Sequence, residues 1–336
     1  MRSLLTVPLI AVALFAAAPA RAADVDLEKL LPGDTDFVVV IDTNKLLNSA
    51  VVKTHVPDVI GRYGYEGLLA ATADNPASQK ALKAKSADIK KFLKDRKEIE
   101  KLLATLGDLV TRMTVAGSVG GGGEPGLVVI EGKWSKDYLE SFLTMMTLFA
   151  PEDASFTSKN GRKVFHIKGG GGPAENIYLT LPSDGLLLFA MDEDDLNAAA
   201  DRAVGKKKPA AKAGIRAMIR DMDPDNAITI LADIGEEGIK MTGGIKVKAD
   251  VQVKVLIDAG DAEKAMALED AIGPAVDNIK DLLADQVEKM PALKVLLDAT
   301  KRLKKSRKGS VLTIELTLTA KEIDSMVKSA LKNDDE

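Results

Sequence analysis

The sequence predicts an α+β protein built from antiparallel sheets with helices packed on one face, arranged as two related units. Residues 245–257 alternate between apolar and polar side chains, which is typical of a strand with one buried and one solvated face. Asn160 and Gly161 form the dipeptide that most strongly indicates a tight hairpin. Amphipathic segments that follow helix-capping residues separate the strand-like runs, as expected when helices cover an antiparallel sheet.

In the first half, the order of elements follows from apolar runs and the residues that flank them. An apolar, mostly β-branched run at residues 37–41 predicts a buried strand, and the one-sided apolar residues of segment 76–106 predict helix. We also expect helices over residues 26–31, 45–52, 135–149 and 192–205, strands over residues 111–116 and 127–131, and hairpins over residues 155–168 and 176–191.

The second half repeats a similar order in fewer residues. A long helix over residues 261–290 follows the alternating strand, with a kink expected at Gly273 and Pro274 because proline lacks the backbone N–H that a helix needs. The similar order predicts an ancient duplication, with the closing helices of the two halves in equivalent places. We further expect helices over residues 215–222, 292–305 and 320–331, and strands over residues 227–232 and 312–318.

The N-terminus has the pattern of a signal peptide. Arg2 precedes an apolar run at residues 4–18, and Ala20-Arg21-Ala22 fits a cleavage site after Ala22. The run is shorter than the roughly 20 apolar residues that span a bilayer, and no later segment is expected to span one. We therefore predict a signal peptide at residues 1–22, a first unit at residues 23–204, a linker at residues 205–214, a second unit at residues 215–332 and an acidic tail at residues 333–336.

Composition narrows the classes of partner and chemistry. The chain holds no cysteine, which excludes disulfides, thiolate metal sites and cysteine nucleophiles. It has 46 Lys and Arg residues against 50 Asp and Glu residues, and only 4% of its residues are aromatic, so we expect no nucleic-acid partner. Export together with this composition predicts a periplasmic or secreted protein.

Several segments resemble catalytic or cofactor-binding motifs, but the elements and residues around them do not fit such a role. Gly121, Gly123 and Gly126 have the spacing of a dinucleotide-binding loop, but that loop must open a helix, and here it leads into a strand. A hairpin loop is the favoured interpretation, and no cofactor is expected. The two histidines, His55 and His166, lack the local serine and acid residues that would indicate a catalytic triad.

Two groups of aspartates are candidates for a metal site. Asp221, Asp223 and Asp225 have the alternating spacing with which a calcium loop begins, but the glycine and glutamate that such a loop needs later are missing. A turn before a strand is the favoured alternative. Asp192 and Asp194 offer carboxylates for a hard cation, or they cap the helix that begins there.

One stretch of the chain concentrates positive charge. It is a candidate for docking on anionic lipid head groups or on acidic polysaccharide, and the favoured alternative is a solvated helix end whose charges complement the helix dipole. The residues of this stretch are Lys301, Arg302, Lys304, Lys305, Arg307 and Lys308.

The opening segment LLPGDTDFVVVID at residues 30–42, with Leu46-Leu47-Asn48-Ser49 after it, resembles the start of uncharacterised exported bacterial proteins. Those proteins begin, after a signal peptide, with a Leu-Pro-x-Asp-Thr strand and a Leu-Leu-x-Ser helix. Residues 111–116, 127–132 and 316–323 also resemble that group. The resemblance implies an envelope setting and a duplicated α+β layout, and it carries no catalytic motif.

These observations favour a non-enzymatic envelope protein that binds a lipid, a glycan or another envelope protein, or has a structural role. The expected place for a ligand is the strand at residues 245–257 under the long helix; packed core is the favoured alternative. The helix residues that would face it are Ala265, Leu268, Ile272, Ile279 and Leu283. The alternative function is a metal-assisted hydrolase whose cleft gathers aspartates of both halves, such as Asp42 and Asp233.

Overall fold

The computed structural model describes residues 25–71, 76–118, 125–149, 154–159, 161–168, 176–234, 238–287 and 290–332. The predicted signal peptide, most of the glycine-rich loop that contains Gly121 and Gly123, Asn160 of the expected hairpin turn and the acidic tail lie outside the described residues. The described part mixes helices with antiparallel strands, which confirms the α+β class. None of the helices within these ranges combines the length and the apolar character needed to cross a bilayer.

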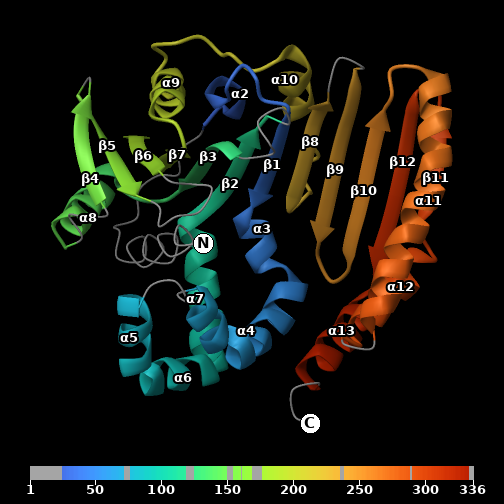
Figure 1. The fold of residues 1–336 in the computed structure, drawn as a ribbon, viewed down its shortest axis with the longest axis horizontal. Helices are drawn as coiled ribbons and strands as arrows, with labels where there is room; N and C mark the ends of the chain where they lie inside the picture. The colour runs from blue at the N-terminus through green and yellow to red at the C-terminus, as the bar shows by residue number, and fades with distance from the viewer. Residues whose placement is uncertain are drawn as a thin grey trace.

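One continuous antiparallel sheet of twelve strands runs through the molecule (Figure 1), in the order β11-β12-β10-β9-β8-β1-β2-β3-β7-β6-β5-β4. β1 and β8 pair at its centre, so the predicted first and second units share one sheet. The strands are β1 (Phe37–Asp42), β2 (Val110–Gly117), β3 (Pro125–Gly132), β4 (Ala154–Lys159), β5 (Arg162–Lys168), β6 (Asn176–Ser183), β7 (Leu186–Ala190), β8 (Ile228–Ile234), β9 (Ile239–Val247), β10 (Val251–Asp258), β11 (Lys304–Lys308) and β12 (Val311–Leu318).

The sheet has two faces, because successive strand residues point to opposite sides. The first face carries Val38, Val40 and Leu231, and these side chains are buried under three helices. The second face carries the alternate residues, such as Val39 and Ile230. The helices on the first face are α2 (Leu27–Leu30), α9 (Glu193–Ala203) and α10 (Ala213–Arg220).

On the second face, helix α8 (Lys136–Phe149) closes a separate core over β5, β6 and β7. Trp134 is fully buried at the start of this helix and packs with Leu139 and Leu143. Gly132 precedes it at a point where a Cβ atom would lie 1.9 Å from the Trp134 ring, so no larger residue fits. Helices therefore cover both faces of the N-terminal part of the sheet.

The remaining helices lie beside the sheet in two groups (Figure 1). The groups meet where the Tyr63 hydroxyl donates a hydrogen bond of 2.8 Å to the carbonyl oxygen of Ala330. The first group is α3 (Thr43–Asn48), α4 (Ala50–Ala71), α5 (Pro76–Ala84), α6 (Ser86–Lys94) and α7 (Arg96–Leu109). The second is α11 (Ala262–Val287), α12 (Leu293–Thr300) and α13 (Ala320–Lys332).

Two predictions about the second half were wrong. The alternating run at residues 245–257 is a hairpin of β9 and β10, because the three-residue turn at 248–250 keeps the alternation in phase across the bend. The helix predicted for residues 292–305 ends at Thr300, and the basic residues that follow form the edge strand β11. Most of α4 was not predicted, because the expected helix there ended at residue 52.

The two halves of the sheet share one connectivity. In each half, three strands are neighbours in chain order: β1, β2 and β3 in the first, and β8, β9 and β10 in the second. Each third strand then pairs with the last strand of its half, β7 or β12, after a crossing that contains α8 or α11 and α12. A helix closes each half, α9 in the first and α13 in the second.

Candidate functional site

Apart from Lys305 and Arg307 of the edge strand β11, the second face of the C-terminal half carries aliphatic side chains, of which Leu312 and Ala232 are buried. The register pairs Ile245 with Val253 and Val253 with Leu316, so the apolar positions of neighbouring strands lie side by side. We name this surface the open apolar face. It consists of Ile228, Ile230, Met241, Ile245, Val247, Val251, Val253, Val255, Ile257, Ile314, Leu316 and Leu318.

Every one of these twelve side chains is partly exposed. The first face of the N-terminal half behaves differently, because Val38, Leu127 and Val129 there are completely buried. In Figure 1, β8, β9 and β10 are visible between α3 and α11, and no labelled helix is drawn across them. Aliphatic side chains of a sheet are normally covered, so this surface is incompletely closed within the described chain.

Helix α11 lies on the same side of the sheet as the open apolar face. The Arg307 side chain, on the second face of β11, donates a hydrogen bond of 2.8 Å from its Nε to Glu269 of α11. Ala265, near the start of α11, is buried, whereas Ile279 on the same helical face is 50% exposed and Leu282 beside it is 67% exposed. The second half of α11 thus presents apolar side chains that the protein does not cover.

In the N-terminal half, the equivalent layer is closed where α8 packs over β5, β6 and β7. Helix α8 crosses between the third and last strands of its half, as α11 and α12 do in theirs. Leu139 and Leu143 of α8 are 0% and 3% exposed, against the half-exposed Ile279 of α11. The two layers have the same place in the connectivity, and over β1, β2 and β3 second-face side chains such as Val39, Val115 and Val128 are partly exposed as well.

A hollow of about 490 Å³ lies where the open apolar face ends. Val247 belongs to both surfaces, and the polar residues Asn44, Asn48, Lys45 and Lys248 also line the hollow. The charges balance locally: Lys45 pairs with Asp42 at 2.6 Å, and Lys248 lies 3.8 Å from Asp225. An aliphatic surface therefore continues into a polar, nearly neutral hollow.

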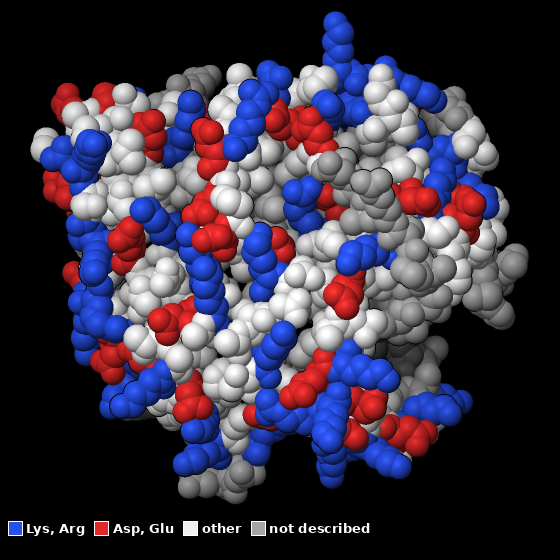
Figure 2. Space-filling view, turned by 180° about the vertical axis from the view of Figure 1, so that it is seen from behind, with Lys and Arg blue, Asp and Glu red and all other residues white. Residues whose placement is uncertain are grey.

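The first face of the C-terminal half is polar. Lys254 pairs with Glu315 at 3.1 Å across β10 and β12, and Gln252 and Thr317 lie opposite each other on the same face. Seen from behind, the molecule carries interspersed charges of both signs (Figure 2). Another hollow of about 490 Å³ on this face is lined mainly by polar and charged groups. This is the solvated side of the sheet, as the alternating sequence predicts.

The aspartates proposed for a metal site pair with lysines. Asp223 lies 2.8 Å from the Lys246 ammonium, whose hydrogen bond lowers the pKa of the Asp223 carboxyl. Asp225 lies 3.8 Å from Lys246, and its backbone N–H donates to Asp223. Asp221 ends helix α10. The group forms a turn before β8, which is the interpretation the sequence analysis favoured.

The second aspartate group caps a helix. The Asp192 carboxylate accepts hydrogen bonds from the backbone N–H groups of Asp194 and Asp195, at 2.8 and 3.0 Å, at the start of α9. The proposed partners Asp42 and Asp233 lie at opposite ends of the β1–β8 pair, because the two strands run antiparallel. Across the ranges that the structure describes, no group of three or more His, Asp or Glu residues is arranged to hold a metal.

The basic stretch is distributed over a turn and the edge strand β11. Lys301 pairs with Asp298 at 2.7 Å, and Arg307 pairs with Glu269 at 2.8 Å. All five residues of β11 are exposed. The residues after Thr300 therefore do not form the helix end that the sequence predicted. Charged side chains on an edge strand disfavour pairing with other chains.

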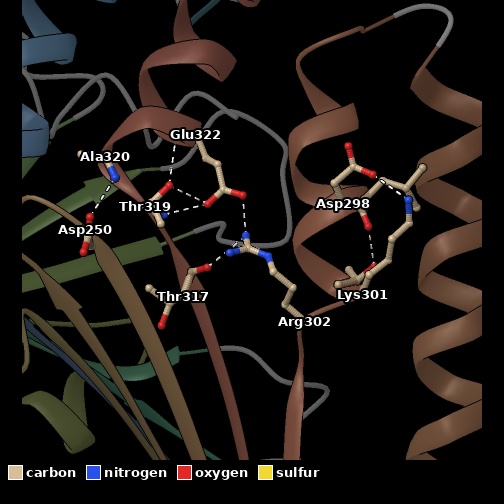
Figure 3. A network of polar contacts seen from close by, with 10 residues as sticks. Asp250, Asp298, Lys301, Arg302, Thr317, Thr319, Ala320 and Glu322 are labelled. Atoms are coloured by element: carbon tan, nitrogen blue, oxygen red, sulfur yellow. Dashed lines mark hydrogen bonds and ion pairs between the residues drawn. The ribbon is translucent and has the colours of Figure 1, made fainter.

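Arg302 belongs to a polar network that holds the start of α13 (Figure 3). Its guanidinium pairs with Glu322, and Glu322 also accepts hydrogen bonds from the backbone N–H of Thr319 at 2.9 Å and from its hydroxyl at 2.8 Å. These hydrogen bonds, chiefly the backbone one, lower the pKa of Glu322 to about 2. Asp250 in the turn before β10 accepts from the backbone N–H of Ala320. The network fixes α13 to the sheet.

The sequence located part of the candidate site and missed the rest. It named the strand positions around Ile245 and Ile257 and helix residues such as Ile279, although packed core was the favoured interpretation of them. The structure leaves these side chains partly exposed. The hollow beside Val247 was missed, because it combines residues from α3, α4 and the β9–β10 turn that are distant in sequence.

No family model and no curated protein matches the chain. Among solved structures, crystal form I of TP0453 is similar over 92% of this chain and 98% of its own, with 13% identity and a TM-score of 0.43. Crystal form IV of TP0453 is similar over 93% of this chain and 97% of its own, with 10% identity and a TM-score of 0.38. Both likenesses are distant, and neither carries functional information for this chain.

Proposed function

We propose that the chain is an exported envelope protein, cleaved after Ala22, which binds an amphiphile with an aliphatic chain and has no enzymatic role. The observation that carries this proposal is the open apolar face, whose twelve aliphatic side chains all remain partly exposed. Covering this surface with a hydrocarbon chain would remove apolar area from water, which is the main favourable term in such binding.

The chemistry of the surface favours a hydrocarbon over a glycan or a protein. A glycan needs hydrogen-bond partners for its hydroxyl groups, and the open apolar face offers only aliphatic side chains. Protein interfaces are enriched in aromatic residues and arginine, and this surface holds neither. Ligand sites are typically apolar surfaces with a few polar groups at one side, which is the arrangement seen here.

The hollow beside Val247 supports an amphiphile with a neutral or zwitterionic head group. Its two lysines lie near Asp42 and Asp225, so an isolated anion would find little net positive charge there. Asn44 and Asn48 line the same hollow with amide groups. The head group would lie in the hollow while the chain extends from Val247 along the open apolar face.

Native mass spectrometry of the mature protein, residues 23–336, purified from its own periplasm or medium, tests the proposed function. We expect a stoichiometric adduct with the mass of a lipid. A bare chain that also fails to bind fatty acids or lysophospholipids on titration would contradict the proposal, and an adduct with the mass of a metal or a glycan would redirect it.

A pair of adjacent substitutions locates the binding surface. Val253→Lys places an ammonium on the open apolar face, whereas Gln252→Lys places it on the polar face one residue earlier. We expect Val253→Lys to reduce fatty-acid affinity at least about tenfold, because the charge would be desolvated beneath the chain. Gln252→Lys should bind like the wild type in the same fluorescence titration. Equal effects of both variants would show that the ligand lies elsewhere.

We further propose that the two halves descend from one duplicated α+β unit. The shared order of strands in the two halves supports this, as does the equivalent place of α9 and α13. A superposition of β1, β2, β3 and β7 on β8, β9, β10 and β12 tests the idea. Strand axes that fail to coincide would contradict it.

A further inference from the structure

Positive charge is concentrated on one helical part of an otherwise acidic protein. Residues 76–101, which form α5, α6 and the start of α7, hold eight lysines and one arginine against four acidic residues. We name this segment the basic lobe. Its net charge is +5, whereas the whole chain carries −4, so the remainder of the chain carries −9. Helices α5 and α6 pack on α4 and on each other at the periphery of the molecule, away from the sheet (Figure 1).

The lysines of the basic lobe are available to a partner. All eight are exposed, and none forms an ion pair with another residue that the structure describes. The single arginine is engaged internally, because Arg96 donates to Asp58 at 2.6 Å and to Glu100 at 2.7 Å. The basic edge strand β11 differs, because its arginine, Arg307, pairs with Glu269 of α11.

The spacing of these lysines disfavours the helices that carry them, so solvation alone does not account for it. Like charges three or four residues apart on one helix face each other and destabilise it. Three such pairs are present: Lys80 with Lys83, Lys90 with Lys94, and Lys97 with Lys101. The helix dipole favours only the lysines in last turns, which are Lys83 of α5 and Lys91 and Lys94 of α6.

Lysines spread over three helices suit an extended anionic surface rather than a single anion. Each ammonium acts as a point charge, and the basic lobe has no free arginine to bind one phosphate with two hydrogen bonds. Lysine is depleted in protein interfaces, and a lone aromatic residue, Phe92, offers no row of rings on which nucleic-acid bases stack.

We infer that the basic lobe docks the protein on the surface of a bilayer that contains anionic phospholipids. Clusters of lysines on helices are attracted to such surfaces. Phe92, between Lys91 and Lys94 in α6, is 38% exposed and adds an apolar contact at the level of the head groups. An acidic polysaccharide would offer this ring no apolar partner. Docking needs no ligand on the open apolar face, so the inference goes beyond the proposed function and does not rest on it.

Sedimentation with lipid vesicles tests the docking on the mature protein, residues 23–336. We expect binding to vesicles of phosphatidylcholine mixed with phosphatidylglycerol, and none to vesicles of phosphatidylcholine alone. Binding should weaken at least about tenfold between about 0.05 M and about 0.5 M NaCl, because salt screens exposed charges.

Two triple variants locate the docking surface. Lys91→Gln, Lys94→Gln and Lys97→Gln combined should weaken binding at least about tenfold, because each lysine near an anionic surface contributes to it. Lys90 is left in place, because its ammonium lies 4.5 Å from the centre of the Tyr65 ring. The matched control combines Lys304→Gln, Lys305→Gln and Lys308→Gln on β11, which removes the same charge and should bind like the wild type. Urea midpoints close to that of the wild type verify that both variants fold.

Three outcomes would overturn the docking. Equal losses in both triple variants would show that the total charge attracts the vesicles, and no particular surface. Binding to phosphatidylcholine alone that persists at high salt would assign the contact to an apolar surface. Binding to dextran sulfate but not to vesicles would assign the basic lobe to acidic polysaccharide. Failure of the protein to bind fatty acids in solution would contradict the proposed function and leave the docking standing.

Discussion

At the scale of single residues, the buried carboxylate of Glu131 pairs with the guanidinium of Arg112. The Glu131 side chain is 3% exposed, and Arg112 donates to both of its oxygens at 2.6 Å, from Nε and Nη2. Removing one member of a buried pair leaves an uncompensated charge, which typically costs about 3–5 kcal/mol. We expect Arg112→Met to lower the free energy of unfolding by about this amount in urea titrations.

The control for this prediction replaces both partners. In Arg112→Met combined with Glu131→Leu, no buried charge remains, so much of the lost stability should return. A loss below about 1 kcal/mol in Arg112→Met would show that other groups or water compensate the Glu131 carboxylate.

Glu322 makes the stability of the C-terminal helix pH-dependent. Its pKa is about 2 in the folded protein, below the ordinary value of 4.5, so the unfolded chain takes up the proton first as pH falls. The stability from Glu322 is therefore complete above the ordinary pKa and is lost as pH falls from 4.5 toward about 2. In Glu322→Gln this part of the acid destabilisation should be absent. The free energy of unfolding near neutral pH should fall by about 1 kcal/mol, because the hydrogen bonds from Thr319 to the Glu322 carboxylate are weakened.

Urea midpoints measured from about pH 6 to about pH 3 check this prediction. Asp298→Asn serves as a comparison, because Asp298 forms a largely exposed ion pair with Lys301 near the same network, and such pairs contribute little to stability. Glu322→Gln and wild-type curves with the same acid slope would show that the pKa of Glu322 is not depressed.

Residue-level prediction from sequence succeeded where the chemistry was local. Asp192 as a helix cap and the Asp223 group as a turn depend on backbone groups within three residues, which a sequence displays directly. The pairing of Glu131 with Arg112 depends on strand pairing across the sheet, which one sequence does not reveal.

At the scale of elements, α11 contains its own flexible point. Gly273 and Pro274 lie near the middle of this 26-residue helix, and Pro274 cannot donate to the Asp270 carbonyl. The half after Pro274 carries the exposed Ile279 and Leu282. We expect this half to move when a chain enters or leaves the open apolar face, because Pro274 interrupts the helix hydrogen bonds that join it to the first half.

Gly273→Ala combined with Pro274→Ala tests this motion. The variant should be more stable, by up to about 3 kcal/mol, because proline and glycine disfavour helix interiors. Stopped-flow association of a fluorescent fatty acid, cis-parinaric acid, should become slower, because a continuous helix bends less readily. Pro57→Ala, which removes the proline inside α4, is the matched control and should leave the association rate unchanged. Unchanged kinetics in the α11 variant would argue for a static helix.

Elements were predicted well where hydrophobic periodicity met clear stop signals, as for α8 and β12. The β9–β10 hairpin was missed because its turn, Lys248-Ala249-Asp250, contains neither glycine nor proline and keeps the alternation in phase. β11 was missed because an edge strand made of Lys, Arg and Ser has no apolar signal at all.

At the scale of the whole molecule, the predicted linker does not separate two independent cores. Residues Val38 of the first half and Leu231 of the second are paired across β1 and β8 and belong to one buried cluster with α2, α9 and α10. Sequence composition marks residues 205–214 as a boundary, but the long-range pairing that joins both halves is invisible in composition. The asymmetry between the closed α8 layer and the open α11 layer is equally a property of the assembled sheet.

The shared sheet predicts that the mature protein unfolds as one unit. Trp134 is the single tryptophan, is fully buried in the first half, and so reports that half alone by fluorescence. Far-ultraviolet circular dichroism reports the helices of both halves. Because separating β1 from β8 would expose the apolar strand Phe37–Asp42 as an edge, we expect the two probes to give superimposable urea transitions. A second transition seen by circular dichroism but not by Trp134 would show that the C-terminal half unfolds separately, and that β1–β8 pairing is too weak to couple the halves.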